Sequence, residues 1–413
     1  MSASNFSSAR GVDDQSSVML VGLGHGAIHW VAATYILLME FIRTDLGLTY
    51  LETTFFGTVF YIASFSTNLF SGPVIDLFGR RVFFQGVSLV IGAVALALFM
   101  VTRDYVLLCA LIAIIGMSNN LWHPAAISFL SSRHPNSRGY VLAVHASGAS
   151  LGDLIAPAVV GALMAWLGMW QTAAAIATVP VFVVAAIIFI FLLPKDTPLE
   201  KQEKPEGSSS LSGYFSGFSS AFQNRLVLGL ALMAGFRSMA QTGLLIFVPL
   251  YVASRFSGDA LAMGAAMSTM QIGGFVAGLI AGTVSDAIGR KPIVLGGTLS
   301  TTLVILALAF IDNQTVFVVG VAILGFFLYA IRPVVHSWLM DMVPPHLGGS
   351  ATSVLFGSQS ILSTLTPIFG GLIADTYGLV YVFYFLAALM LISNLIAMTL
   401  PKSLPPADSA ETA

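Results

Sequence analysis

Charged side chains are scarce in this sequence. Only 9% of its 413 residues are Asp, Glu, Lys or Arg, whereas 57% are hydrophobic, and a soluble domain carries about 25% charged residues. This is too little charge to cover a water-facing surface, so the composition excludes a soluble enzyme and a disordered protein. The mean hydropathy of +0.90 indicates a protein that crosses a membrane several times.

A basic excess, cysteine pairs and nucleotide-binding motifs are also missing. The 17 Lys and Arg against 19 Asp and Glu leave a net charge of −2, which excludes a polybasic nucleic-acid-binding protein. The single cysteine, Cys109, excludes an intrachain disulfide framework. Neither the Walker A pattern nor the H-E-x-x-H pattern occurs. The sequence therefore predicts no ATPase, no cofactor and no metal site.

Apolar runs long enough to cross a membrane recur along the chain. A helix needs about 20 apolar residues to span the hydrocarbon core, and lipid favours helices because each satisfies its own backbone hydrogen bonds. We predict an all-α polytopic membrane protein with twelve transmembrane helices in two six-helix halves. The predicted spans are 18–40, 50–72, 82–101, 105–130, 140–166, 171–193, 226–252, 260–284, 292–311, 315–341, 350–374 and 378–400.

One long polar stretch separates the two halves. Residues 194–225 are rich in charged residues, Pro, Gly and Ser, which is typical of a linker. Four aromatic residues between 214 and 222 indicate either a short interfacial helix or an early start of the seventh span. The expected organisation is a tail at 1–17, a bundle at 18–193, a linker at 194–225, a bundle at 226–400 and a tail at 401–413.

Basic residues predict the orientation in the membrane. Twelve of the 17 Lys and Arg fall on one side of the predicted spans, three on the other, and two, Arg237 and Arg332, inside spans. The positive-inside rule places the basic side and both termini in the cytoplasm. The run from Val18 to Met39 is too long for a signal-peptide core. Short loops favour a bacterial inner membrane. Charges near the opposite surface are interpreted as solvated: Glu40, Glu52, Asp312 and Asp375.

An internal repeat relates the two halves. Residues 72–81 read GPVIDLFGRR, and residues 282–291, 210 positions later, read GTVSDAIGRK. Pro157 and Pro367 share this offset. Parallel six-helix halves are a known transporter design, with the binding site at the interface between them.

The repeated element resembles the signature loop of the major facilitator superfamily, and the resemblance covers nearly the whole chain. It implies secondary transport by rocking of two bundles, with the first, fourth, seventh and tenth helices lining the central cavity. We interpret the loops as latches, although their basic residues alone can also set topology. The predicted gating residues are Gly72, Asp76, Gly79, Arg80, Arg81, Asp286, Gly289, Arg290, Lys291 and Asp341.

Asp341 is the predicted partner of Arg290 in the second latch. The equivalent position of the first half holds Ser131, so the first latch lacks that carboxylate. This departs from the family's usual charge relay and puts the symmetry of the two gates in doubt.

A narrower resemblance lies in the fourth and fifth spans. The step Trp122-His123-Pro124 is similar to that of the fosmidomycin-resistance-type branch, which implies efflux of small, often anionic compounds. The stretch 148–161 loosely resembles the antiporter motif of proton-driven exporters, with Ala-Pro in place of Gly-Pro at Pro157. The alternative is ordinary tight packing of small residues between helices.

Ionisable residues inside the spans are the candidates for transport chemistry. An intramembrane charge costs at least about 2.5–3.5 kcal/mol on insertion scales and needs a partner or a water-filled cavity. Arg237 and Arg332 would hold an anionic substrate, and Trp122 would stack on it or wall it. The predicted substrate-binding residues are His25, His29, Asn120, Trp122, His123, Arg237, Gln241, Arg332 and His336.

Histidines and one aspartate are the predicted proton carriers, because histidine titrates near neutrality. For each histidine the alternative is an interhelical hydrogen bond, and for the aspartate a structural pair with a neighbouring helix. The predicted proton-coupling residues are His25, His123, His145 and Asp153.

Together these features predict a secondary active transporter for a small anionic organic solute or drug, with proton-coupled efflux as the leading direction. Proton-coupled uptake of an organic acid is the first alternative. A non-transporting receptor and a membrane-embedded enzyme are alternatives of other classes. The expected partners are the bilayer, a small-molecule substrate and protons, without nucleic acid, and the expected state is a monomer.

Overall fold

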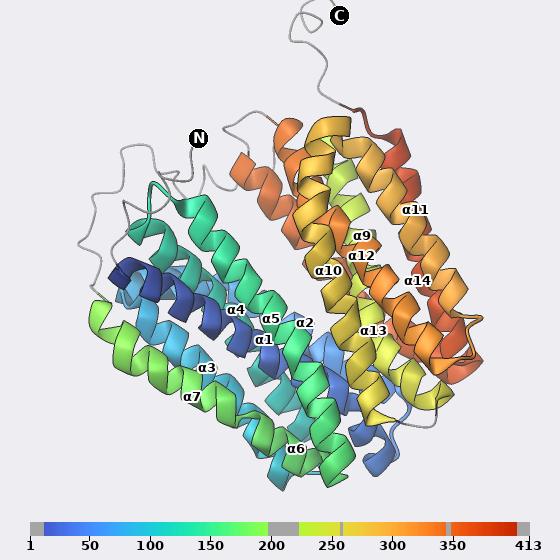
Figure 1. The fold of residues 1–413 in the computed structure, drawn as a ribbon, viewed down its shortest axis with the longest axis horizontal. Coiled ribbons are helices and arrows are strands. Elements are labelled where there is room, and N and C mark those ends of the chain that lie inside the picture. Colours follow the sequence, from blue (N-terminus) through green and yellow to red (C-terminus); the bar gives the residue numbers. More distant parts are fainter. Residues whose placement is uncertain (1–11, 197–222, 257–258, 344–347, 403–413) are drawn as a thin grey trace, which may run out of the picture. The chain divides into compact units, whose positions relative to one another are not determined.

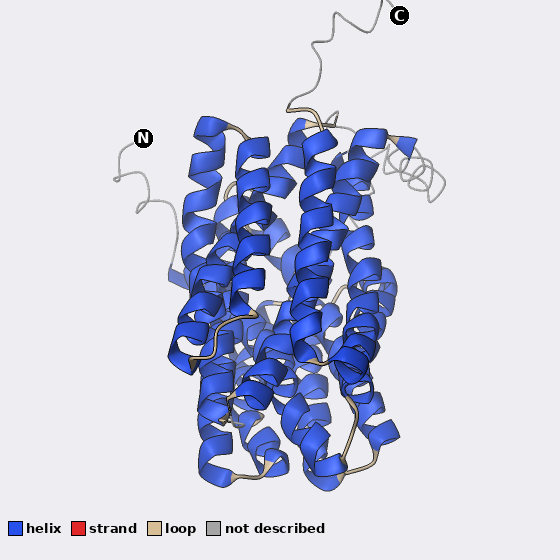
Figure 2. Ribbon diagram, turned by 90° about the vertical axis from the view of Figure 1, so that its right-hand side faces the viewer, coloured by secondary structure: helices blue, strands red, loops and turns tan. Residues whose placement is uncertain are grey.

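The computed structural model describes residues 12–196, 223–256, 259–343 and 348–402. All regular elements within these ranges are helical (Figure 2). The predicted interfacial helix and most of the predicted linker lie outside the described residues.

The chain divides into two compact units, Met1–Gly47 with Val59–Lys201, and Leu48–Thr58 with Gln202–Ala413. The first unit contains α1 (Val12–Leu46), most of α2 (Tyr50–Phe78), α3 (Arg81–Ala97), α4 (Tyr105–Arg133), α5 (Arg138–Leu167), α6 (Trp170–Ala177) and α7 (Val179–Ile187). The second contains α9 (Arg225–Arg255), α10 (Ala260–Ile288), α11 (Arg290–Leu308), α12 (Gln314–Asp341), α13 (Gly348–Tyr377) and α14 (Leu379–Thr399) (Figure 1).

Each predicted span corresponds to helix in the structure, with α6 and α7 together forming the sixth. Among the described residues, ten segments are long and apolar enough to cross a membrane. The other two spans are α2, of 29 residues, and α13, of 30 residues. The first helix begins earlier than the predicted first span. α1 begins at Val12, inside the predicted tail, because Tyr140 and Lys195 donate hydrogen bonds to side chains of its first turns.

The 210-residue repeat is confirmed in three dimensions. α10 begins and ends 210 residues after α2, and α13 does so after α5. A Cβ atom at Gly116 would lie 2.5 Å from the carbonyl oxygen of Phe60, and one at Gly325 would lie 1.9 Å from that of Met270. The corresponding two helices of each half therefore come close together at a glycine, at positions 209 residues apart, where a Cβ atom would meet backbone.

The small-residue face of α5 packs against α1. A Cβ atom at Gly148 would lie 1.9 Å from the carbonyl oxygen of Gly22, and one at Gly152 would lie 2.1 Å from that of Gly26. Both contacts are made within the first unit, so they support the packing interpretation of residues 148–161.

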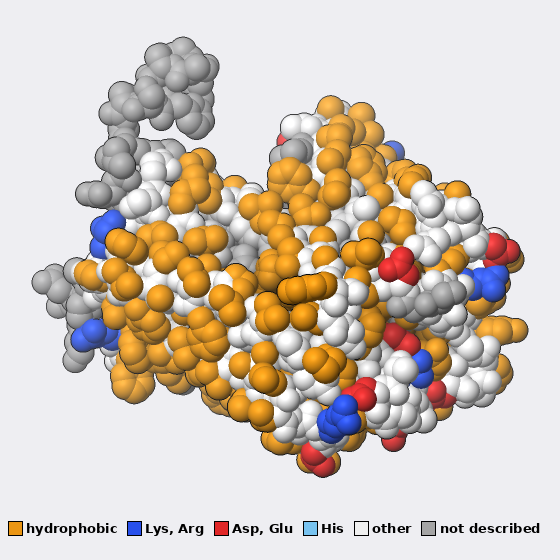
Figure 3. All heavy atoms as spheres, turned by 60° about the horizontal axis from the view of Figure 1, so that its bottom comes forward, with side chains coloured by type: hydrophobic (Ala, Val, Ile, Leu, Met, Phe, Trp, Pro, Cys, Tyr) orange, Lys and Arg blue, Asp and Glu red, His pale blue; other side chains and the backbone are white. Residues whose placement is uncertain are grey.

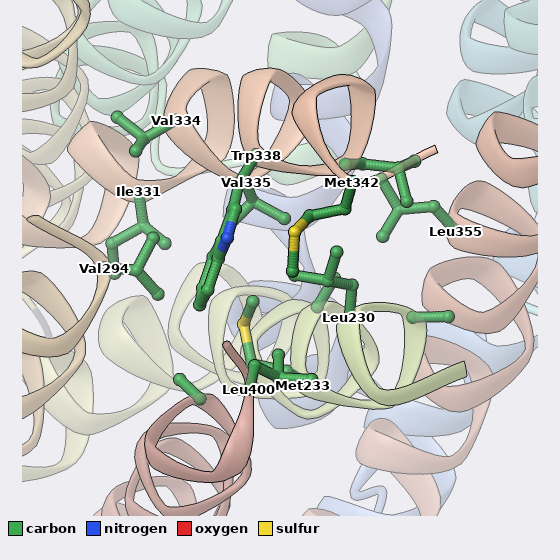
Figure 4. Packing of buried hydrophobic residues seen from close by; sticks show 14 of the residues in the cluster. Leu230, Met233, Val294, Ile331, Val334, Val335, Trp338, Met342, Leu355 and Leu400 are labelled. Atoms are coloured by element: carbon green, nitrogen blue, oxygen red, sulfur yellow. The ribbon is translucent and has the colours of Figure 1, made fainter. Parts of the chain in front are cut away.

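The core of the second unit surrounds Trp338. Its ring is fully buried and projects from α12 into a cluster with Met233 of α9, Val294 of α11 and Leu400 (Figure 4). The outer surface is also apolar. Hydrophobic side chains cover most of the face in Figure 3, and its acidic and basic groups gather in small patches. A chain with this surface needs a lipid environment.

The four end charges interpreted as solvated all have partners: Glu40 is buried, whereas Glu52, Asp375 and Asp312 are exposed, and Asp312 pairs with Arg255. Glu40 is buried and receives two hydrogen bonds from the Arg43 guanidinium, at 2.7 and 2.8 Å. Glu52 accepts from the backbone amide of Thr49, whose hydroxyl accepts from the amide of Glu52. This reciprocal pair is the capping box of α2.

The third, Asp375, belongs to α13 and also caps α2. Its two oxygens accept from the backbone amides of Tyr50 and Leu51, at 2.8 and 2.9 Å. The Thr54 hydroxyl donates to the carbonyl oxygen of Pro367 at 2.7 Å. These bonds explain why residues 48–58 group with the second unit rather than with the predicted first bundle.

Candidate functional site

The predicted intramembrane residues fall into two groups. The histidine cluster comprises His25 and His29 of α1, His123 of α4, and His145 and Asp153 of α5, all in the first unit. The arginine pair comprises Arg237 of α9 and Arg332 of α12, both in the second unit.

His25 lies at the centre of the histidine cluster and is only 5% exposed. Its Nδ1 lies 2.7 Å from the carbonyl oxygen of His145, and its Nε2 lies 3.2 Å from Nε2 of His123. The rings of His25 and His145 are stacked with centroids 3.7 Å apart. Three predicted site residues on three different helices, His25, His123 and His145, therefore meet in one cluster.

His29 pairs with Asp153, the one carboxylate of the cluster. Nδ1 of His29 lies 3.0 and 3.1 Å from the two carboxylate oxygens, and the two side chains are 25% and 28% exposed. The His25 and His29 rings meet edge to face at 4.8 Å. His29 was predicted for substrate binding and Asp153 for proton coupling, and the structure makes them one pair.

Trp122 does not wall an open site in this structure. Its ring is fully buried, and its Nε1 donates to Nε2 of His145 at 3.2 Å. In this structure Trp122 therefore positions His145, and its contact with substrate stays a prediction. Asn120 is half-buried one turn before His123, and no hydrogen bond between described residues joins it to the cluster.

Arg237 is the buried member of the arginine pair. Only 2% of it is exposed, and one terminal nitrogen donates to Oε1 of Gln241 at 2.7 Å and to the carbonyl oxygen of Leu328 at 3.1 Å. Its Nε has no hydrogen-bond partner among the described residues. A buried guanidinium without a carboxylate is costly, so it favours an arriving anion.

Arg332 is exposed and forms no ion pair with any described residue. It acts electrostatically on both Arg237 and His336. The His336 ring, half-buried, lies against Phe356 with centroids 4.8 Å apart. Arg237 and Arg332, two positively charged side chains on different helices, therefore lie near enough to repel each other.

The second latch loop has the predicted partners. Arg290 contacts Asp286, and its Nε lies 3.1 Å from Asp341. Gly289 has a φ of +95° and its counterpart Gly79 a φ of +65°, the region that favours glycine.

In the first latch, Arg81, which corresponds to Lys291 at the 210-residue offset, donates to the hydroxyl of Ser132. The side chain of Asp76 lies outside the described residues. The remaining gating residues are Gly72, Arg80 and Lys291, of which Lys291 donates to the carbonyl oxygens that end α14.

One enzyme-like pattern lies next to the cluster but does not form an enzyme site. Residues 148–152 read G-A-S-L-G, matching the G-x-S-x-G of a nucleophile elbow, which requires a sharp strand-to-helix turn. Here all five residues lie inside α5, and the Ser150 hydroxyl donates to the carbonyl oxygen of Ala146.

An apolar groove of about 610 Å³ runs between α1, α5 and α7. Met19, Leu23, Trp30 and Ile155 are among its lining residues, and it contains none of the predicted site residues. It has no titratable group to orient a charged solute, so we do not assign the binding site to it.

Sequence reasoning missed Asp196, which it assigned to the linker. Its carboxylate accepts from the backbone amides of Val82 and Phe83 at 3.0 and 3.1 Å, capping α3. A signal was present, because the residue that precedes α3 is Arg80, which cannot cap a helix start.

Comparison with known proteins points to one family. The model of the Major Facilitator Superfamily matches residues 21–256 and 230–413. The chain is 24% identical to the sialic acid transporter NanX of Escherichia coli (strain K12), over 83% of each chain. It is also 24% identical to the multidrug efflux pump Tap of Mycolicibacterium fortuitum, over 81% of this chain and 83% of that one.

Solved structures show the same fold. A bacterial homologue of the human lysosomal transporter Spinster, inward-facing and unoccupied, superposes with a TM-score of 0.77 at 14% identity, covering 97% of this chain and 100% of that one. The nucleoside transporter NupG gives a TM-score of 0.75 at 14% identity, covering 92% of this chain and 98% of that one.

Proposed function

This chain belongs to the major facilitator superfamily, and from that premise we propose that it exports a small anionic organic solute by alternating access, coupled to protons. Family membership makes it a secondary transporter and an integral, multi-pass membrane protein rather than an enzyme. The observation that carries the anionic substrate is the charge of Arg332, without an ion pair among the described residues, beside the buried guanidinium of Arg237.

The electrostatics of the arginine pair support an anion. Two guanidinium groups near each other repel, and a carboxylate or phosphonate between them would remove that repulsion. Arginine presents a planar set of donors that matches such groups in a bidentate fashion. Gln241 and His336, on the same two helices, would complete the polar lining.

Protons are the proposed coupling ion, because the sequence has no nucleotide-binding motif of its own. Support comes from the placement of all four predicted proton carriers, His25, His123, His145 and Asp153, in one cluster. Export is favoured by the multidrug efflux relatives. Uptake remains the alternative because another relative is a sialic acid transporter.

The proposal also covers the subfamily, the oligomeric state and the membrane in which the protein lies. We place the chain in the fosmidomycin-resistance-type branch on the Trp122-His123-Pro124 step. We also propose a monomer in a bacterial inner membrane, with both termini and the 194–225 linker in the cytoplasm.

Everted membrane vesicles test the proposed direction and substrate class. Cells that produce the chain are compared with cells that lack it, using a panel of small organic anions and cations and a lumenal pH dye. We expect anions to enter the lumen and alkalinise it. Acidification together with anion movement would establish symport, and transport of cations alone would overturn the anionic substrate.

The latch proposal predicts a slower cycle without weaker binding. Asp341→Asn removes the charge that faces Arg290, so we expect turnover to fall several-fold while substrate affinity stays within twofold. Asp312→Asn is the matched control, since Asp312 pairs with Arg255 on the exposed surface, where ion pairs contribute little. Counterflow in proteoliposomes measures both parameters, and a loss of affinity in Asp341→Asn would contradict the latch.

A further inference from the structure

We propose that the histidine cluster is a binding site for a divalent first-row transition-metal cation such as Zn²⁺, held by Nε2 of His25, His29 and His123. The inference uses contacts inside the first unit only and does not depend on the identity of the transported solute. The sequence predicted no metal, because no H-E-x-x-H pattern occurs and the histidines are dispersed over several helices.

The hydrogen bonds decide which nitrogen of each ring carries a lone pair. Nδ1 of His25 faces a backbone carbonyl, of His145, at 2.7 Å, and Nδ1 of His123 faces that of Asn119 at 2.8 Å. Nδ1 of His29 faces the Asp153 carboxylate. Carbonyl and carboxylate oxygens only accept, so all three Nδ1 atoms are donors. In the neutral rings every Nε2 is therefore a lone-pair donor suited to a metal.

Two of these lone pairs face each other. Nε2 of His25 lies 3.2 Å from Nε2 of His123. In the neutral rings, with each proton held at Nδ1, neither Nε2 can donate to the other, so either a proton or a metal ion placed between them would relieve the repulsion. Zn–N bonds of about 2.0–2.1 Å in a tetrahedral site place two nitrogens about 3.3 Å apart. The observed separation matches that spacing.

The third ligand lies close by. One ring nitrogen of each of His25, His29 and His123 lies within 4.8 Å of the others. His25 and His29 are four residues apart on α1 and so project from one face. Nδ1 of His29 contacts Asp153, so Nε2 of this ring, which is a quarter exposed, is the nitrogen we assign to the metal. Three nitrogens leave the fourth position open for water or an anion.

The surroundings resemble those of established histidine metal sites. Metal-binding histidines almost always donate their other N–H to a carboxylate, a backbone carbonyl or water, which orients the ring and raises its basicity. Here all three rings have such an acceptor. His145 adds a stacked ring, and Trp122 holds His145 in place. Imidazole ligands select Zn²⁺, Co²⁺, Ni²⁺ or Cu²⁺ over Mg²⁺ and Ca²⁺, which take oxygen ligands.

Titration of purified, tag-free protein with Zn²⁺ tests the site directly. We expect one saturable site per chain by calorimetry, with no comparable heat from Mg²⁺. His25→Ala and His123→Ala should each weaken binding at least a hundredfold. His134→Ala is the matched control, because His134 ends α4 away from the cluster, and it should bind as tightly as the unaltered chain.

Two further measurements separate loss of the site from loss of the fold. His29→Gln changes a partly exposed ring, and we expect it to stay monodisperse while binding Zn²⁺ far more weakly. Asp153→Asn should weaken binding about 10- to 100-fold and shift the visible absorption of bound Co²⁺, which a purely structural role would not do. Absence of saturable Zn²⁺ binding, or equal binding in the His123→Ala and His134→Ala variants, would overturn the proposal.

Discussion

Replacing Arg332 with alanine is expected to abolish transport while the protein remains folded. Arg332 is exposed and has no ion pair with the described residues, so its removal leaves no buried charge without a partner. A charge-assisted hydrogen bond contributes about 1.5–3 kcal/mol. Loss of a bidentate contact to an anion should therefore weaken binding about a hundredfold or more.

The measurement is counterflow of the best-transported anion from the vesicle panel, with thermal unfolding of the purified variant as the folding check. Arg332→Lys keeps the charge but not the planar donors, and we expect partial recovery. Arg255→Ala is the control, because Arg255 is an exposed arginine paired with Asp312, and it should transport normally. Normal affinity in Arg332→Ala would exclude Arg332 from the binding site.

Replacing Gly148 with alanine is expected to destabilise the first unit strongly. The new Cβ would lie 1.9 Å from the carbonyl oxygen of Gly22, and because this neighbour is backbone rather than a flexible side chain, α1 and α5 must separate. Overpacking costs about 1–3 kcal/mol and occasionally more. The separation would also disturb the contact of His25 with His145, which joins the same two helices.

Gly139→Ala in the same helix is the matched control. A Cβ atom there meets nothing within 4 Å, and alanine is favoured over glycine in helices by up to about 1 kcal/mol. In thermal unfolding, the melting temperature of Gly139→Ala should equal or exceed that of the unaltered chain. The melting temperature of Gly148→Ala should fall by several degrees, because 1 kcal/mol corresponds to about 2–4 °C for a unit of about 150–250 residues. Equal melting temperatures would show that α1 and α5 are not tightly packed.

Much of the architecture follows from sequence because it depends on local or periodic properties. Apolar runs predicted the helices, and the 210-residue repeat predicted which of them correspond. Glycine at 79 and 289 carried a conformational requirement that the positive φ values confirm. The Arg290–Asp341 pair could be anticipated because both residues stand at span ends on the same predicted side of the membrane.

Charged groups at helix ends were predicted less well. Asp375 and Asp196 were interpreted as solvated or linker residues, yet each accepts backbone amides of a helix more than a hundred residues away. Such bonds satisfy donors that a helix start leaves unpaired. No sequence window contains both partners, so only the folded chain shows them.

The sequence by itself determined that this protein is a helical membrane protein, because hydropathy and charge are summed along the chain, and its repeated loop, through the family resemblance, indicated a transporter. It also identified the ionisable residues, because a charged or titratable side chain is conspicuous in an apolar helix. Only the tertiary structure decided their partners. It directed every Nδ1 of His25, His29 and His123 to an acceptor on another turn or helix, and it buried Trp122 against His145. Hydrogen-bond direction depends on how helices pack, and that packing is what turns separate histidines into one proposed metal site.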